Sequence, residues 1–317
     1  MTDLPQASTA AAGVQSRLSA RWAAIRPRMI DGAFAAGWSV LPSVPERVAG
    51  AAFDAVGTVS AMRPGAYAQL RANLRQVVGP SYSEKQLDAL TRRSVRSYTR
   101  YWREVFQLPG IDPADVERRT EYLGGEHVER AMHGGRGVVI ALTHSGNWDA
   151  AAVQLCQVRG YAMTSVAERL KPESLYERFK RFRESLGMSL VPLTGGPEPS
   201  VVTLKRALNE GQQITLLADR DLQANGIPVQ LCGRGTTMPT GPGLMALQTG
   251  SALLPLELGY TETGWRMRFH PEIEMPTEGR LREGVTYGMT ALAEIFTDVI
   301  RRNPQDWHML QKIWPDV

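Results

Sequence analysis

Short apolar runs rich in β-branched residues recur along the chain and predict buried β-strands. The clearest run covers residues 138–142, has the sequence VVIAL and follows Gly137. An apolar run without polar alternation is typical of a parallel strand that is covered on both faces. A polar turn comes soon after it, and a helix is expected to start near Asp149. Further strands are predicted at residues 161–167, 214–218, 252–258 and 266–270.

Segments with apolar residues at spacings of three and four predict helices between and around these strands. Between residues 64 and 106 the spacing is carried by Tyr67, Leu70, Leu74 and Val77. The end of this segment places four aromatic residues on one helix face: Tyr98, Tyr101, Trp102 and Phe106. Such a stripe is more typical of a core than of a lipid contact. More helices are predicted at residues 175–186, 201–210 and 286–301. The pattern predicts an α/β fold, with a central mostly parallel sheet flanked by helices and an N-terminal helical extension.

The N-terminal segment differs from the rest of the chain. Residues 1–13 are small and polar and are expected to form a disordered tail, whereas residues 14–317 are expected to form a single domain. Helices over about residues 14–60 are expected to associate with a membrane, because an amphipathic segment there carries several arginines: Arg17, Arg21, Arg26 and Arg28. The uncharged stretch 32–45 is shorter than the roughly 20 residues that span a bilayer. Two alternatives stay open for it, insertion into the membrane interface and packing against the core.

Composition narrows the function class only a little. With 317 residues and 43% apolar content, the chain can bury a full core. The net charge of +4 suits an anionic membrane surface, and no nucleic-acid motif accompanies it. No continuous apolar segment marks a secretory signal. Cys156 and Cys232 stand in apolar or glycine-rich surroundings, which favours reduced thiols in a cytosolic setting over a disulfide.

The chemistry of the chain is expected at His144, just after the run 138–142. Open α/β sheets present their ligand sites at the carboxyl ends of parallel strands. An imidazole, with an ordinary pKa of about 6.5, can remove a proton from an alcohol when a carboxylate orients it. Asp149 and Asp219 are both candidates for that carboxylate. Along a continuous helix, His144 and Asp149 would lie about 140° apart, so this pair requires His144 to lie in the turn. A structural role for His144 is the alternative.

The segment from His144 to Asp149 has the pattern His-x4-Asp, which resembles the signature of the glycerolipid acyltransferase superfamily. The longer text LTHSGNWDAAA is similar to the branch that holds the lipid A acyltransferases and the actinobacterial phosphatidylinositol mannoside acyltransferases. Other blocks of this branch recur in the same order, among them RYWREVFQLP, Arg183 with Gly187 as R-x3-G, and a C-terminal DWH. The resemblance covers about residues 20–312.

The resemblance implies an α/β acyltransferase that moves a fatty acyl group, expected to be palmitoyl, from acyl-coenzyme A to a mannose hydroxyl of phosphatidylinositol mannoside. The implied transfer is direct, with His144 as the general base. Arg183 is implied to bind a phosphate or a developing oxyanion, and Glu168 to hold Arg183 or to meet sugar hydroxyls. No metal or prosthetic group is implied. The protein is expected to be peripheral, at the cytoplasmic face of the plasma membrane.

Several points stay open at this stage. The mannoside acyltransferases carry a glutamate where this chain has Asp219, and the lipid A branch tends to have aspartate, so Asp149 remains an alternative or additional orienting group. No G-x-S-x-G elbow is present, which argues against a covalent intermediate. The alternative functions are acylation of another glycolipid or a lysophospholipid, hydrolysis of acyl thioesters, and lipid binding without catalysis. Trp307 is expected to be structural. The sequence indicates no oligomeric state, and no role is assigned to the remaining histidines: His127, His133, His270 and His308.

Overall fold

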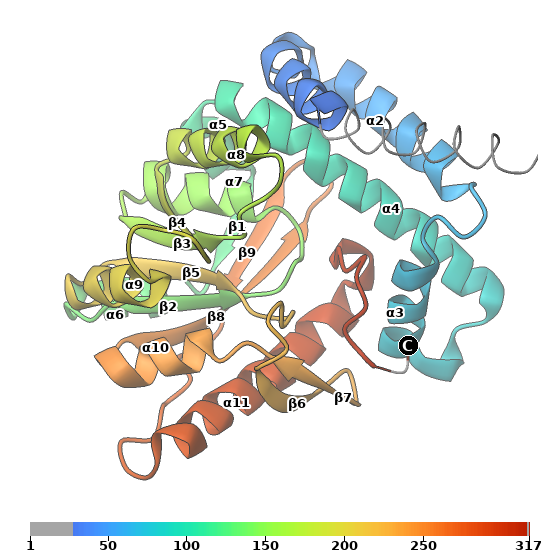
Figure 1. The fold of residues 1–317 in the computed structure, drawn as a ribbon. Helices are drawn as coiled ribbons and strands as arrows, with labels where there is room; N and C mark the ends of the chain where they lie inside the picture. The colour runs from blue at the N-terminus through green and yellow to red at the C-terminus, as the bar shows by residue number, and fades with distance from the viewer. Residues whose placement is uncertain (1–27, 316) are drawn as a thin grey trace, which may run out of the picture.

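The computed structural model describes residues 28–315 and 317, and its centre is a sheet of seven strands in the order β1-β9-β8-β2-β5-β3-β4 (Figure 1). Strands β8, β2, β5, β3 and β4 are parallel to one another, β9 is antiparallel to β8, and β1 is parallel to β9. The strand bounds are β1 Thr120–Leu123, β2 Val138–Leu142, β3 Met163–Ala167, β4 Met188–Pro192, β5 Gln213–Leu217, β8 Ala252–Tyr260 and β9 Trp265–Phe269. The prediction of a mostly parallel sheet in an α/β fold is therefore confirmed.

Helices cover both faces of this sheet, with α5, α7 and α8 on one side and α10 and α11 on the other in Figure 1. The α-helices are α2 Glu46–Ala61, α3 Ala68–Val78, α4 Glu84–Gln107, α5 Pro113–Arg119, α6 Gly125–His133, α7 Trp148–Val153, α8 Glu173–Ser185, α9 Ser200–Asn209, α10 Gly241–Thr249 and α11 Leu281–Arg302. Shorter elements are the 3₁₀ helices η1 Leu41–Ser43, η2 Gly79–Ser81, η3 Leu108–Gly110 and η5 Pro304–Asp306, and the π-helix η4 Gln154–Val158.

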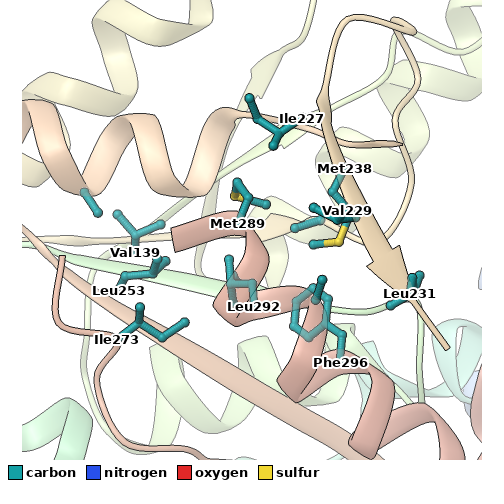
Figure 2. Close-up of a cluster of buried hydrophobic side chains, with 14 of the residues drawn as sticks. Val139, Ile227, Val229, Leu231, Met238, Leu253, Ile273, Met289, Leu292 and Phe296 are labelled. Atoms are coloured by element: carbon teal, nitrogen blue, oxygen red, sulfur yellow. The ribbon is translucent and has the colours of Figure 1, made fainter. Parts of the chain in front are cut away.

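Strand β2 is buried along its whole length, as its apolar run predicts. Val139 and Ala141 face a core shared with α9, α10 and α11, whereas Val138, Ile140 and Leu142 face a second core under α6 and α7. Figure 2 shows the first of these cores, where α11 packs between the sheet and a hairpin formed by β6 (Ile227–Leu231) and β7 (Arg234–Met238). The two covered faces leave only the ends of β2 available to a ligand.

The N-terminal extension packs against α4. A helix over residues 28–40 precedes α2, and its Phe34 and Trp38 rings contact Trp102 and Phe106 of α4. The aromatic stripe of α4 is therefore core, as predicted, and Phe34 and Trp38 of the stretch 32–45 pack inward against it. Most other residues of this stretch are exposed, Val40 among them, and so is Met29 before it. The predicted tail 1–13, and three of the four arginines, Arg17, Arg21 and Arg26, lie outside the described residues.

No helix within residues 28–315 is both long enough and apolar enough to cross a membrane.

Candidate active site

His144 and Asp219 meet at the carboxyl edge of the sheet because they follow two adjacent parallel strands. Leu142 of β2 pairs with Leu217 of β5, and each strand continues for two residues to its polar side chain. The Asp219 Oδ1 atom lies 2.6 Å from Nδ1 of His144, and Asp219 Oδ2 accepts the backbone N–H of His144 at 2.9 Å. The Trp307 indole N–H also donates to Oδ2, at 2.8 Å. Three donors thus hold Asp219 in one orientation.

Asp219 is fully buried but remains suited to the ionised state. Burial alone raises the pKa of a carboxyl group, but the interaction with His144 and the Trp307 N–H outweigh this effect and hold the pKa of Asp219 below its ordinary value. An ionised carboxylate only accepts hydrogen bonds, so Nδ1 of His144 carries the proton. The Nε2 atom of His144 is then left with its lone pair, and a quarter of this side chain is exposed. This arrangement can remove a proton from a bound hydroxyl.

Asp149 has different partners from Asp219. Its Oδ1 accepts Nε of Arg183 at 2.8 Å, and its Oδ2 accepts the Tyr101 hydroxyl at 3.0 Å. Burial lowers the pKa of Arg183, but the adjacent Asp149 charge outweighs it, so the pKa of Arg183 is raised and the guanidinium stays charged. The structure therefore places Asp219 on the imidazole and Asp149 on the arginine.

A cavity of about 210 Å³ lies beside this edge, between α4, α7 and α8. Its wall combines aromatic and charged side chains, including Trp102, Trp148, Glu168, Tyr176, Lys180 and Arg183. Trp148 also connects the cavity to the base, because its ring lies 5.9 Å from that of His144 and 4.3 Å from that of Tyr101. Glu168 and Arg183, which the sequence already linked, thus line one cavity near His144.

The C-terminal segment contributes contacts that the sequence did not predict. The backbone N–H of His308 donates to the carbonyl of His144 at 2.8 Å. The His308 ring lies 3.0 Å from the Ser97 hydroxyl, which donates to Asp306 at 2.8 Å. Burial, together with the nearby His144, lowers the pKa of His308 to about 3, so its ring is neutral. The C-terminal DWH text was the available signal, but only the fold brings it to His144.

Other potential nucleophiles are less suited to chemistry. The Ser145 hydroxyl is buried and hydrogen bonded to the Thr143 hydroxyl at 2.7 Å. Cys156 and Cys232 are free, and burial raises the pKa of each thiol to about 12. Within residues 28–315, no three His, Cys, Asp or Glu side chains are grouped so that they could hold a metal ion.

Comparison with known proteins agrees with the geometry. Residues 22–315 match the family model described as bacterial lipid A biosynthesis acyltransferase. A phosphatidylinositol mannoside acyltransferase of Mycolicibacterium smegmatis is 43% identical over 287 residues, covering 90% of this chain and 92% of the relative. A phosphatidylinositol mannoside acyltransferase of Mycobacterium tuberculosis is 42% identical over 286 residues, covering 90% and 88%. With a histidine and a buried carboxylate at its sheet edge, and a match along most of its length, this chain belongs to the bacterial lipid A biosynthesis acyltransferase family.

Proposed function

We propose that this protein transfers a fatty acyl group, with palmitoyl as the proposed group, from acyl-coenzyme A to a mannose hydroxyl of phosphatidylinositol mannoside. The observation that carries the proposal is the pairing of His144 with buried Asp219 beside a cavity lined by Glu168 and Arg183. The names of the two mycobacterial relatives support the choice of acceptor.

In the proposed step, Nε2 of His144 removes the proton of the mannose hydroxyl while the hydroxyl oxygen attacks the thioester carbonyl. The tetrahedral oxyanion collapses, the bond from carbon to sulfur breaks, and the coenzyme A thiolate takes the proton from the imidazolium. Asp219 stabilises that imidazolium and fixes its tautomer. Arg183 binds Asp149 through Nε and stays charged, so its guanidinium is proposed to stabilise the oxyanion or a phosphate.

Direct transfer fits the side chains better than a covalent acyl-enzyme. Ser145 is buried and hydrogen bonded to Thr143, and both thiols have a raised pKa. A nucleophile needs exposure and an adjacent base, and these three groups lack that combination. The step as written requires no metal or prosthetic group, and acyl-coenzyme A acts as a co-substrate.

The cavity wall suits a sugar. Glu168, directly after β3, can accept hydrogen bonds from two hydroxyl groups, while the Trp102 and Tyr176 rings offer apolar surface to the sugar ring. This assignment favours the glycolipid over a lysophospholipid, because a glycerol backbone offers fewer hydroxyl groups to the same carboxylate.

Peripheral membrane binding is proposed to use α2. Three exposed apolar residues of α2 share one face, within about 120° of the helix, with the exposed C-cap Met62. The three are Val48, Val56 and Val59, and each of the four side chains is at least 60% exposed. Arg47 and Arg63 are exposed at the two ends of this face, and Arg96 of α4 is exposed where α2 packs on it. An apolar face edged with arginines fits an anionic bilayer surface. The lipid acceptor and acyl-coenzyme A place the protein, in this proposal, at the cytoplasmic face of the plasma membrane.

The test is product analysis with palmitoyl-coenzyme A labelled in the acyl chain. The protein is incubated with phosphatidylinositol mannoside, with a mannose-free phosphatidylinositol, and with a lysophospholipid. Labelled acyl-mannoside as the main product supports the proposal. Label on the lysophospholipid would change the acceptor, free palmitate alone would indicate a hydrolase, and unconsumed thioester with every acceptor would indicate a lipid-binding protein without catalysis.

A further inference from the structure

Glu104 is a buried carboxylate outside the residues assigned so far. It lies on α4 and is 2% exposed. Its Oε1 accepts Nε of Arg100 at 2.7 Å and Nη2 of Arg103 at 3.3 Å. Its Oε2 accepts two neutral donors, the Asn147 amide at 2.7 Å and the Trp265 indole N–H at 2.8 Å. Four donors make this carboxylate the junction of α4, the turn after β2 and strand β9.

Asn147 is the contact through which Glu104 reaches the candidate active site. Asn147 is buried and is the N-cap of α7, where its Oδ1 accepts the backbone N–H groups of Asp149 at 3.1 Å and Ala150 at 2.9 Å. An asparagine amide can flip, and in the flipped orientation its nitrogen would face those N–H groups. The hydrogen bond to Glu104 fixes the orientation in which the oxygen caps the helix.

The same face of α4 holds the neighbouring parts of the site. Ser97, Tyr101 and Glu104 are spaced by four and three residues, so they lie on one side of the helix. Ser97 contacts His308, and Tyr101 binds Asp149. Glu104 differs from both because its partner is Asn147, which lies in the turn that carries His144.

We propose that Glu104 is a positioning residue for acyl transfer, which acts through Asn147 to hold the turn from His144 to Trp148 in its reactive geometry. The inference rests on the proposed function. Glu104 does not touch the reacting atoms. It orients the cap of α7, the cap places the Trp148 ring against His144, and the imidazole is thereby aimed at the acceptor hydroxyl.

The test compares variants that break this link with one that removes another partner of the same oxygen. Glu104→Gln replaces one oxygen with a donor, so either Asn147 and Trp265 or the two arginines face an N–H group. Asn147→Ser retains a good N-cap but is too short to reach Glu104. Trp265→Phe is the matched control, because it removes the indole donor to Oε2 and leaves Asn147 in place.

With the labelled-palmitate assay, Glu104→Gln and Asn147→Ser are each expected to lower kcat by about 10- to 100-fold, as a displacement of roughly 1 Å does. The double variant is expected to match the single variants, since both break one contact. KM for palmitoyl-coenzyme A and the pH at which activity falls to half on the acid side are expected to stay as in wild type. Trp265→Phe is expected to keep kcat within about threefold, even if its thermal unfolding temperature falls.

Additive losses in the double variant, an equal loss of kcat in Trp265→Phe, or a shifted acid limb would each overturn the inference, because they indicate general destabilisation or a charge effect. Full activity of Asn147→Ser would overturn it as well. If Glu104→Gln does not fold, Asn147→Ser against Trp265→Phe decides the question. Absence of labelled glycolipid with the wild-type protein would overturn the proposed function, and this inference with it.

Discussion

Asp149 and Asp219 have the same side chain and similar burial, yet they serve different partners. Asp219 follows a strand-like run and Asp149 lies where a helix is expected to start, and the sequence pattern did not decide which of them orients His144. The direction of the Asp149 carboxylate depends on the turn after β2, where Gly146 has a φ of 57° and Asn147 is the N-cap of α7. Local periodicity does not encode this turn, so the sequence predicted His144 and both acids but not their pairing.

His308 makes a prediction at the residue scale. Because burial lowers its pKa to about 3, the folded state keeps this ring neutral while the unfolded chain takes up a proton below about pH 6.5. The His308 contribution to stability is therefore lost as the pH falls from about 6.5 towards 3, by at most about 1.4 kcal/mol per pH unit.

The measurement is urea unfolding of wild type and His308→Gln from pH 7 to pH 4.5. The difference in unfolding free energy between the two proteins is expected to change with pH, since glutamine does not titrate. A constant difference across this range would show that His308 is not held neutral by the fold.

At the scale of elements, the patterns that predicted correctly belong to the interior of the sheet. Strands β2, β3, β5, β8 and β9 and helices α8, α9 and α11 appear within a few residues of their predicted positions, although α11 begins five residues earlier, at Leu281. Strands β1 and β4 were not predicted. Both missed strands lie at the edges of the sheet and are only partly buried, so neither has the continuous apolar run that marks a central strand such as β2. Helices α5 and α6 are short and were also not predicted.

The turn after β2 depends on Gly146. This residue has a positive φ, and a Cβ atom there would lie 2.9 Å from the backbone nitrogen of Gly259 on β8. Gly146→Ala is expected to destabilise the fold by about 2–4 kcal/mol and to lower acyl transfer, because strain and steric contact both displace the turn.

Gly160→Ala is the matched control for this change. Gly160 also has a positive φ, but a Cβ atom there meets nothing within 4 Å. Thermal unfolding and activity of both variants separate backbone strain from steric contact with β8. Gly160→Ala is expected to lower the free energy of unfolding by only about 1–2 kcal/mol and to keep its kcat. Equal behaviour of the two variants would show that packing of the turn against β8 is unimportant.

At the scale of the whole molecule, α4 lies between α2 and the sheet (Figure 1). The sheet class and the two strand ends that meet there follow from the sequence. The return of the C-terminal segment to His144 does not follow from the sequence, because the backbone hydrogen bond from His308 to His144 joins residues 164 positions apart. Pairing between distant segments is decided by packing, and a hydrophobic period carries no information about it.

The proposed membrane face of α2 gives a prediction at this scale. Val56→Asp with Val59→Asp is expected to weaken binding to anionic vesicles by roughly tenfold or more, because two apolar contacts become charged. Vesicle sedimentation measures the change, and stability is expected to stay near wild type since both side chains are exposed.

Leu281→Asp serves as the control for the vesicle experiment. Leu281 is 50% exposed at the start of α11, and this end of α11 lies at the opposite end of the molecule from α2 in Figure 1. This variant is expected to sediment like wild type. Unchanged binding of the α2 variant would remove α2 from the membrane proposal.

The most direct test of the account is the rate of palmitate transfer to phosphatidylinositol mannoside by wild type, His144→Ala and Asp219→Asn, each with its unfolding temperature measured. We expect His144→Ala to lower the rate by about 100-fold or more while remaining folded, as loss of a general base does, and Asp219→Asn to lower it as well. A folded His144→Ala variant that transfers palmitate within a few-fold of the wild-type rate would contradict the account.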